Sequence, residues 1–578
     1  MLQPIADIAE QCARLGIRHF VLSPGSRCAP LTLAVARHPQ IQTRVVPDER
    51  AAAYIALGMA QALGETVGLI CTSGTAAYNY APAVAEAFYQ HVPLLVLTAD
   101  RPPEWIDQQD GQTLHQQNLY GSHVKGSYHL PDTYAHPDLV WHLHRQVNEA
   151  INLSQTGAKG PVHINVPLRE PFYPRAEEPW QYTQDLKITE RLEAEPRLPQ
   201  LVWEQLAGEW QQYNQKLIVA GQGLWNEKLQ TALEQTSRQQ RIPVVADIIS
   251  NLHGLKGRIS KQDSFLGLSL QQQGQAQGEA LQPELLITFG ASVISKNLKL
   301  FLRKYKPKAH WHIQAHGPVA DTFKSLTRII PVEPAYFFAE LNNRGIRAEE
   351  QLPLQKTYNR SWQEQEETTE KAAAGFFNEE VWGEFWAVKQ CLQQLPQETH
   401  LHLANSMSVR YANFIGLAQE QKNIQVWANR GTSGIDGCNS TALGGAIAEG
   451  KLTVLITGDM AFLYDRNAFW HSFLPSNLRI LVLNNAGGGI FRMIEGPRRQ
   501  PELEEYFVTK QPFNAQPTAQ EAGFRYSNCQ SIKEFKEALP AFLSEEGGAM
   551  VLEVFSNSAA NTDIFNRYKQ AMQERNAR

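Results

Sequence analysis

The sequence lacks most of the features that mark secreted, membrane-bound and metal-clustered proteins. Its six cysteines are scattered and form no Cys-x-x-Cys pair, so we expect reduced cysteines and a reducing compartment. There is no run of about 18 apolar residues and no basic-then-apolar leader, so neither a membrane-spanning helix nor a secretion signal is predicted. The 17 histidines include no His-Glu-x-x-His motif and no clustered metal-ligand spacing.

An excess of charge of one sign is also missing. Lys and Arg total 53 and Asp and Glu total 58, which gives a formal net charge of −5. This balance argues against a nucleic-acid surface, so any anion site must be local. Hydrophobic residues make up 43% of the chain and charged residues 19%, as in ordinary globular enzymes. We expect a cytoplasmic protein with no nucleic-acid or membrane partner.

What the sequence does contain is a repeated alternation of apolar runs and helical patterns. The runs are continuous rather than alternating, which predicts parallel strands buried on both faces. Because 578 residues exceed a single core, we predict three consecutive doubly wound α/β domains, at 1–180, 195–345 and 375–578. The expected strands are 18–23, 44–46, 67–72, 93–98 and 162–166, then 216–220, 242–246, 285–289 and 310–314, then 400–404, 424–427, 452–456, 480–483 and 549–555.

Two segments between these domains have a different composition. The stretch from Pro174 to about Gln200 is rich in Pro, Glu and Arg without a clear apolar face, which is typical of an interdomain linker. Residues 347–374 are charged and compatible with a helix, so they are predicted to form a second linker or a solvated helix.

The last third contains a pattern that predicts a metal-diphosphate site. A strand ends at Gly458-Asp459, one helix follows, and the next strand ends at Asn484-Asn485. Since ligands bind outside the carboxyl ends of parallel strands, Asp459 and Asn485 are expected to face one crevice. A carboxylate, an amide oxygen and a backbone carbonyl such as that of Gly487 suit Mg²⁺. The alternative is that these residues only form turns and helix caps.

Two further segments carry candidate chemistry. Asp48-Glu49-Arg50 stands between an expected strand and an apolar helix, and Glu49 is the candidate acid-base carboxylate. The alternative is that Asp48 caps the helix and Glu49 only complements its positive end. In the last third, the glycine-rich segment 431–437 opens a helix and can bring backbone amides to an anion, although its glycines also permit tight turns.

Taken together, seven motifs in one order resemble a single family. They are Ser23-Pro-Gly-Ser-Arg27, Asp48-Glu49-Arg50, Thr72-Ser-Gly-Thr75, Leu97-Thr-Ala-Asp-Arg-Pro102, Gly160-Pro-Val-His-Ile-Asn-Val-Pro167, Asn429-Arg-Gly-Thr-Ser-Gly-Ile-Asp436 and Asn484-Asn-Ala-Gly-Gly488. The family is 2-succinyl-5-enolpyruvyl-6-hydroxy-3-cyclohexene-1-carboxylate synthase, the thiamine-diphosphate enzymes of menaquinone and phylloquinone synthesis. The motifs lie in the first and last domains. Met460 replaces the usual second glycine, and Asn297 replaces a basic residue expected beside Lys296.

The resemblance implies a pyrimidine-binding, a central and a diphosphate-binding domain, with thiamine diphosphate and Mg²⁺ (or Mn²⁺) as cofactors. The implied reaction decarboxylates 2-oxoglutarate and adds the succinyl unit to isochorismate, with Glu49 against the aminopyrimidine ring. The implied cofactor contacts are Glu49, Thr75, Gly431, Ser433, Gly434, Ile435, Gly458, Asp459 and Asn485, and the implied metal ligands are Asp459, Asn485 and Gly487. The implied substrate contacts are Ser26, Arg27, Arg101, Gln112, Lys296, Ser406, Arg410, Arg430 and Ile490.

The resemblance also implies an oligomer. Glu49 and Asp459 belong to different domains, and in thiamine enzymes these usually come from different subunits, so a homodimer or homotetramer with active sites between subunits is expected. Two alternatives stay open. One is another thiamine-dependent 2-oxoacid decarboxylase or acetolactate-type synthase, whose smaller monoanionic substrate would not need the predicted arginines. The other is an inactive regulatory subunit of the thiamine fold, against which the intact Glu49, Asp459 and Asn485 speak.

Overall fold

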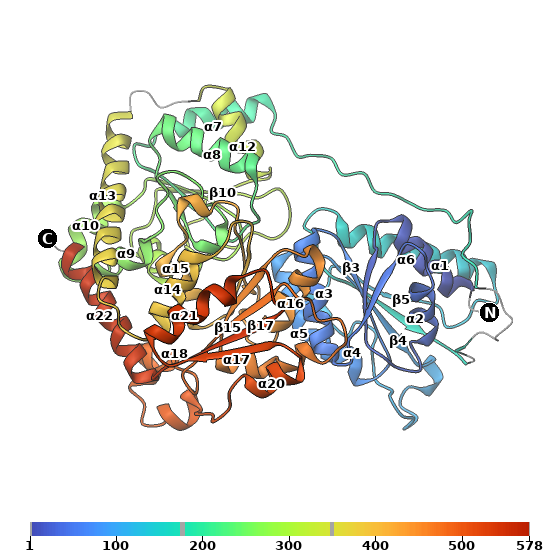
Figure 1. Cartoon of the computed structure of the whole chain (residues 1–578). Coiled ribbons are helices and arrows are strands. Elements are labelled where there is room, and N and C mark those ends of the chain that lie inside the picture. The colour runs from blue at the N-terminus through green and yellow to red at the C-terminus, as the bar shows by residue number, and fades with distance from the viewer. Residues whose placement is uncertain (1–2, 171, 174–179, 347–351, 577–578) are drawn as a thin grey trace.

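Three parallel β-sheets, each with its own helices, follow one another along the chain (Figure 1). The computed structural model describes residues 3–170, 172–173, 180–346 and 352–576. Neighbouring strands run parallel in all three sheets. The predicted fold of three consecutive α/β domains is confirmed. The sheets lie inside the three predicted domain ranges, whose limits stay a prediction.

The first sheet has six strands in the order β2-β1-β3-β4-β6-β5. They are β1 (His19–Leu22), β2 (Gln42–Val45), β3 (Val67–Cys71), β4 (Leu94–Asp100), β5 (Ser127–His129) and β6 (Val162–Pro167). The helices of this domain are α1 (Gln3–Arg14), α2 (Ala29–Ala36), α3 (Glu49–Leu63), α4 (Thr75–Asn79), α5 (Ala81–Gln90) and α6 (Pro137–Gln155), with the 3₁₀ turns η1 (Pro103–Trp105) and η2 (Gly121–His123). Every residue of β3 and β4 is buried, as expected for apolar strands covered on both faces.

The central sheet has five strands in the order β11-β10-β9-β7-β8. They are β7 (Lys216–Ala220), β8 (Val244–Ala246), β9 (Leu285–Phe289), β10 (Ala309–Ile313) and β11 (Arg328–Ile330). Its helices are α7 (Gln200–Trp210), α8 (Glu227–Gln240), α9 (Gln262–Ser269), α10 (Gln275–Leu281), α11 (Lys296–Lys304) and α12 (Pro334–Asn343), with η3 (Ile248–Ser250) and η4 (Gln272–Gly274). The long helix α13 (Leu352–Phe377) follows.

The third sheet repeats the strand order of the first, as β13-β12-β14-β15-β17-β16. Its strands are β12 (His400–Leu403), β13 (Gln425–Trp427), β14 (Thr453–Gly458), β15 (Leu478–Asn484), β16 (Arg525–Cys529) and β17 (Met550–Phe555). Its helices are α14 (Glu384–Gln394), α15 (Met407–Ile415), α16 (Cys438–Glu449), α17 (Asp459–Tyr464), α18 (Ile490–Met493), α19 (Glu495–Arg498), α20 (Gln516–Glu521), α21 (Ile532–Leu543) and α22 (Ser558–Asn576), with η5 (Gln419–Gln421), η6 (Arg466–Phe469) and a π-helical turn η7 (Leu503–Val508).

Three strands in the described part of the chain were not predicted, and all three lie at sheet edges. They are β5, β11 and β16, each the last strand on one side of its sheet. An edge strand pairs on one side only and needs no continuous apolar run. The sequences Ser-Tyr-His, Arg-Ile-Ile and Arg-Tyr-Ser-Asn-Cys accordingly carry no clear strand pattern.

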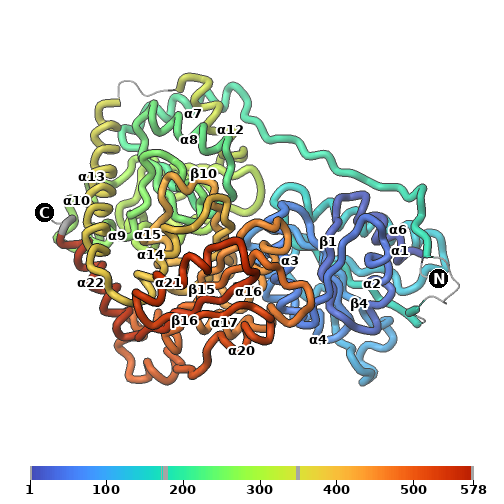
Figure 2. Tube along the Cα trace, viewed as in Figure 1, coloured from blue at the N-terminus to red at the C-terminus, as the bar shows by residue number. Residues whose placement is uncertain are grey.

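The two segments predicted as linkers differ in structure. Residues 174–179 and 347–351 lie outside the described part of the chain, whereas residues 180–199 contain neither helix nor strand and run from the first domain to the central one (Figure 2). Most of the second segment is the helix α13. This helix is not fully solvated, because Tyr358 and Trp362 on its inner face are buried in the apolar core of the central domain.

The first and third domains share an interface formed by α3 and α16, which lie side by side (Figure 1). Glycines let the two backbones approach closely. A Cβ atom at Gly58 would lie 2.0 Å from the Thr441 carbonyl oxygen, and one at Gly444 would lie 2.1 Å from the Ile55 carbonyl oxygen. Both domains contribute to one buried apolar cluster around this crossing. Their relative position is therefore set by close backbone contact.

No helix among the described residues has the length and apolar character needed to span a membrane. All six cysteines are buried and carry free thiols.

Candidate active site

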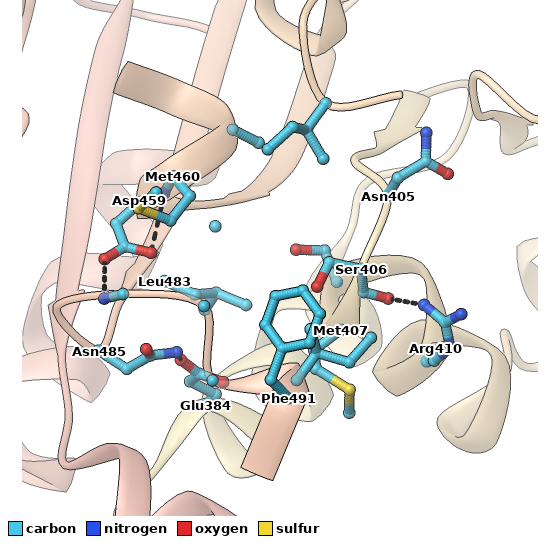
Figure 3. A pocket seen from close by; sticks show the side chains of 18 of the residues that line it. Glu384, Asn405, Ser406, Met407, Arg410, Asp459, Met460, Leu483, Asn485 and Phe491 are labelled. Carbon is cyan, nitrogen blue, oxygen red and sulfur yellow. Dashed lines mark hydrogen bonds between the residues drawn. The ribbon is translucent and has the colours of Figure 1, made fainter. Parts of the chain in front are cut away.

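A cavity of about 410 Å³ opens at the carboxyl edge of the third sheet (Figure 3). The strands β14 and β15 are neighbours there, with Gly458 paired to Leu483, so the residues that follow them lie close together. Ten predicted site residues line the cavity: Ser406, Arg410, Arg430, Ser433, Ile435, Gly458, Asp459, Asn485, Gly487 and Ile490. The sheet geometry therefore brings together most of the residues predicted in the last domain.

Asp459 begins α17 and is 3% exposed. Its Oδ2 accepts hydrogen bonds from Gly487 N and Gln511 Nε2, both at 2.8 Å, and its Oδ1 accepts one from Met460 N at 2.9 Å. Burial raises the pKa of the Asp459 carboxyl to about 6, against these hydrogen bonds, which lower it. The carboxylate thus joins the loop after β15 to the start of α17, and its negative charge lacks a cationic partner among the described residues.

Asn485 points its amide at a second buried acid, Glu384, the first residue of α14. Asn485 Nδ2 donates to Glu384 Oε1 at 2.5 Å, which fixes the amide orientation. The Asn485 Oδ1 atom is buried and accepts no hydrogen bond from the described part of the chain, an arrangement that is costly without a further partner. Burial raises the pKa of the Glu384 carboxyl to about 7.

These groups fit a hard divalent cation. One carboxylate, one unpartnered amide oxygen and a nearby backbone carbonyl are oxygen ligands of the kind that Mg²⁺ accepts when phosphates complete its shell. Within the described ranges, no three or more His, Cys, Asp or Glu side chains lie close enough together to hold a metal ion by themselves. The phosphates of a bound cofactor would supply the remaining ligands of such a centre.

The glycine-rich segment after β13 forms one wall of the cavity. Asn405 holds this wall from inside, because its Nδ2 donates to Asn429 O at 2.7 Å and to Gly434 O at 2.6 Å. Two serines that line the cavity have positive φ angles, which are rare in residues other than glycine. They are Ser406 at φ 74° and Ser433 at φ 63°. Strained residues of this kind cluster where function requires a particular shape.

Two arginines, Arg410 and Arg430, line the same cavity, and Figure 3 shows Arg410 on the side away from Asp459 and Asn485. Arg430 Nη1 donates to Asn405 Oδ1 at 2.8 Å. Arg410 Nη1 donates to Ser406 O at 2.5 Å (Figure 3). Burial lowers the pKa of both guanidinium groups, and for Arg430 the charge of Arg410 lowers the pKa further. Within the described residues neither arginine forms an ion pair, so both can accept an anion in the cavity.

The predicted residues of the first domain form a second group at the carboxyl edge of the first sheet. Ser26 and Arg27 follow β1, Glu49 follows β2, Thr75 follows β3, and Arg101 follows β4. Gln112 lies in the same group, because its Cα would be 3.2 Å from a Cβ placed on Gly74. None of these residues lines the cavity of the third domain.

Glu49 is the first residue of α3 and is half-buried. The preceding Asp48 caps the helix, since its Oδ1 accepts a hydrogen bond from Ala51 N at 3.0 Å. Asn79 Nδ2 donates to Glu49 Oε2 at 3.5 Å, a weak contact that leaves the carboxylate available. The helix is therefore capped without Glu49.

The arginines of the first domain differ in their partners. Arg27 is 7% exposed, donates from Nη1 to Leu168 O at 2.8 Å and stacks 4.8 Å from the centroid of Phe172. Arg101 pairs with Asp110 at 2.7 Å. In the central domain, Lys296 begins α11, is exposed and does not line the cavity, so its predicted role stays a prediction.

Two family models match the first and the third domain of the chain. The family described as "Thiamine pyrophosphate enzyme, N-terminal TPP binding domain" matches residues 5–119, and "Thiamine pyrophosphate enzyme, C-terminal TPP binding domain" matches residues 406–554. A protein of Cytophaga hutchinsonii named 2-succinyl-5-enolpyruvyl-6-hydroxy-3-cyclohexene-1-carboxylate synthase is 43% identical over 575 residues, which cover 99% of each chain. The chain belongs to this synthase family.

Other members of the synthase family are similar along almost the whole chain. Proteins of the same name from Porphyromonas gingivalis and Desulfotalea psychrophila are 38% and 37% identical, and the matches cover 96% of this chain in each case and 94% and 98% of theirs. The family resemblance inferred from the seven motifs is confirmed, as is dependence on thiamine diphosphate.

Polar residues in and beside this synthase's cavity were missed in the sequence, among them Glu384, Asn405 and Gln511. Glu384 and Asn405 line the cavity, and Gln511 bonds Asp459. Glu384 begins a helix far from any motif, and Gln511 lies in an irregular segment between η7 and α20. A signal existed only for Asn405, which directly precedes the predicted Ser406 at the end of a strand.

Proposed function

We propose that this chain decarboxylates 2-oxoglutarate and adds the succinyl unit to isochorismate, giving 2-succinyl-5-enolpyruvyl-6-hydroxy-3-cyclohexene-1-carboxylate for menaquinone or phylloquinone synthesis in the cytoplasm. One observation carries the proposal. The same cavity is lined by oxygen atoms that could bind a cation, around Asp459 and Asn485, and by the guanidinium groups of Arg410 and Arg430, which form no ion pair within the described residues.

Asp459, the free Oδ1 of Asn485 and the carbonyl of Gly487 would hold Mg²⁺, or Mn²⁺, together with the diphosphate. Bound thiamine diphosphate supplies the nucleophilic carbon and the electron sink that decarboxylation of a 2-oxo acid needs. Glu384 would keep the Asn485 amide turned so that its oxygen, not its nitrogen, faces the cation. The neighbouring loop 431–435 would support the cofactor through Ser433 and Ile435.

Both proposed substrates are dicarboxylates, which matches the charge of the cavity. Arg410 and Arg430 would each bind a carboxylate, since guanidinium groups bind carboxylates through paired hydrogen bonds. Their desolvated positions strengthen such contacts, because few waters remain to compete. Ile490 and Phe491 line the same cavity and would exclude water from the reacting groups.

The residues of the first domain would complete the site from a second copy of the chain. Glu49 would then face the aminopyrimidine ring and exchange a proton with it, while Arg27 and Arg101 would add positive charge near the substrates. The separation of the two groups within one chain supports a homodimer, or a homotetramer built from such dimers.

The test is to combine purified protein with thiamine diphosphate, Mg²⁺, 2-oxoglutarate and isochorismate and to identify the product by mass. We expect isochorismate to be consumed and CO₂ released only when all four components are present. Pyruvate, added instead as the 2-oxo acid, serves as the matched control and should react poorly. Turnover of pyruvate to acetolactate at an equal rate would refute the proposed substrates.

A further inference from the structure

Glu86 is a buried carboxylate in the first domain that none of the functions described above uses. It lies on α5 and is 0% exposed. It forms no salt bridge with Lys, Arg or His in the part of the chain that the structure describes. Burial of a carboxylate costs free energy unless strong donors compensate the charge. Apart from Gln90 on the same helix, the donors that do so here belong to a different domain.

Those donors are in the glycine-rich loop of the third domain. Gly431 N donates to Glu86 Oε1 at 2.7 Å, and Thr432 N donates to Oε2 at 2.6 Å. The Thr432 hydroxyl also donates to Oε2, at 2.5 Å. Both carboxylate oxygens are therefore bonded to two successive residues of one loop, 345 and 346 positions away along the chain.

The contact is close as well as polar. A Cβ atom at Gly431 would lie 2.8 Å from the backbone carbonyl oxygen of Glu86 and 3.0 Å from the Cβ of Tyr89. Gln90 adds a further donor to Glu86, and Gln222 of the central domain bonds both Gln90 and the Ala428 carbonyl just before the loop. The loop is thus fitted to α5 at a junction of all three domains.

The same loop forms the cavity wall on its other side. Arg430 comes immediately before the residues that Glu86 binds, and Ser433 and Ile435 follow them and line the cavity. Asn405 bonds the loop from inside the cavity, at Asn429 O and Gly434 O. The short segment is therefore held between one side chain within its own domain and one carboxylate from outside it.

We propose that Glu86 is a positioning residue that sets the backbone of residues 431–435 for cofactor binding and places Arg430 for the substrate carboxylate. The inference rests on the proposed function only for the identity of that substrate. Glu86 and Glu49 lie in the same domain. In a dimer, this domain would contribute Glu49 to the active site of the partner chain, and Glu86 would position the cofactor loop in the active site of its own chain. Movement of that domain would then affect both sites.

Two variants test the role of Glu86. In Glu86→Gln, one carboxylate oxygen becomes an NH₂ group, so at least one loop N–H must face another donor and lose its acceptor. Thr432→Val removes only the hydrogen bond from the Thr432 hydroxyl to Glu86. Because Thr432 is exposed, this variant should fold even if Glu86→Gln does not. We expect the Kd of thiamine diphosphate at saturating Mg²⁺ to rise about 10-fold or more in Glu86→Gln and about 3-fold in Thr432→Val.

The matched control is Glu366→Gln. Glu366 is also a buried carboxylate that accepts two backbone N–H groups and one hydroxyl, from Ser260 and Lys261, but it lies away from the cavity. Glu366→Gln should lower the melting temperature while leaving the Kd of thiamine diphosphate unchanged. If the Glu86 and Thr432 variants only lower the melting temperature, as this control does, Glu86 is an ordinary interface residue and the inference is wrong.

Kinetics separate this inference from the proposed substrates. In Glu86→Gln, the Michaelis constant for the 2-oxo acid substrate should rise several-fold more than kcat falls, because Arg430 is displaced while Glu49 is untouched. If wild-type protein does not turn over 2-oxoglutarate, the proposed substrates are wrong, but the Kd of thiamine diphosphate still decides the role of Glu86. A fall in kcat alone, with the Michaelis constant and the Kd of thiamine diphosphate both unchanged, would contradict the positioning role.

Discussion

The replacement of Asp459 by asparagine isolates the negative charge that we assign to cation binding. The side chain keeps its size, and one oxygen still accepts a hydrogen bond. The other oxygen becomes an NH₂ group, so a donor that now bonds the carboxylate, such as Gly487 N at 2.8 Å, loses its acceptor. The cofactor-free protein should therefore lose about 1–3 kcal/mol of stability and remain folded.

The loss of cofactor affinity should be larger. Removing one partner of a buried charge pair costs about 3–5 kcal/mol, because the other charge stays behind without compensation. For the Asp459 carboxylate and Mg²⁺, this corresponds to a Kd of thiamine diphosphate that is roughly 100- to 4,000-fold higher. Titration calorimetry of thiamine diphosphate at saturating Mg²⁺ measures it directly.

Asp465 provides the control for this experiment. It is also buried, at 0% exposed, and accepts hydrogen bonds from Ser440 N and Ser440 Oγ, both at 2.7 Å, but it does not line the cavity. Asp465→Asn should destabilise the protein without changing cofactor affinity. A wild-type Kd in Asp459→Asn would show that this carboxylate only closes a turn, and the metal assignment would then be wrong.

Three other variants test separate parts of the account. Gly58→Ala should lower the free energy of unfolding by about 1–3 kcal/mol in calorimetry, because its Cβ would lie 2.0 Å from the Thr441 carbonyl oxygen. Glu384→Ala should weaken Mg²⁺ and cofactor binding about 10-fold in titrations, because the Asn485 amide loses the acceptor that orients it. Burial lowers the pKa of His402 to about 3, so at pH 5 only the unfolded imidazole binds a proton. The wild type should therefore lose about 2 kcal/mol of unfolding free energy between pH 7 and pH 5 that His402→Gln does not lose. Urea denaturation of both proteins at the two pH values measures this difference.

For each of these three variants, one result would contradict the prediction. An unchanged unfolding free energy in Gly58→Ala would mean that α3 and α16 can separate at no cost. Unchanged affinity in Glu384→Ala would mean that the Asn485 amide is oriented by other groups. A stability difference between wild type and His402→Gln that does not vary with pH would mean that the folded protein holds a charged imidazole.

The interior of the fold could be predicted better than its edges. Strands such as β7 (Lys216–Ala220) and β9 (Leu285–Phe289) were predicted at their observed bounds, because burial on both faces demands continuous apolar runs. The edge strands β5, β11 and β16 have no such demand and were missed. The helix α13 was predicted as a linker or solvated helix, because its charged residues hide the few apolar side chains that it buries.

The candidate site shows the same limit. Asp459 and Asn485 could be predicted, because each directly follows a recognisable strand and parallel strands end at one edge. Glu384 and Glu86 could not, since each acts through a contact with a segment distant in sequence, at Asn485 and at Gly431. Only folding brings these pairs together, and no local pattern marks either partner.

The central claim is that Glu49 of one chain and Asp459 of another build a single active site. The most direct test mixes inactive Glu49→Gln with inactive Asp459→Asn under conditions of verified subunit exchange. In a mixed dimer one site carries both changes and the other neither, so an equal mixture should recover about a quarter of wild-type activity. No recovery, despite mixed dimers detected by native mass spectrometry, would place both residues in the site of one chain and contradict the account.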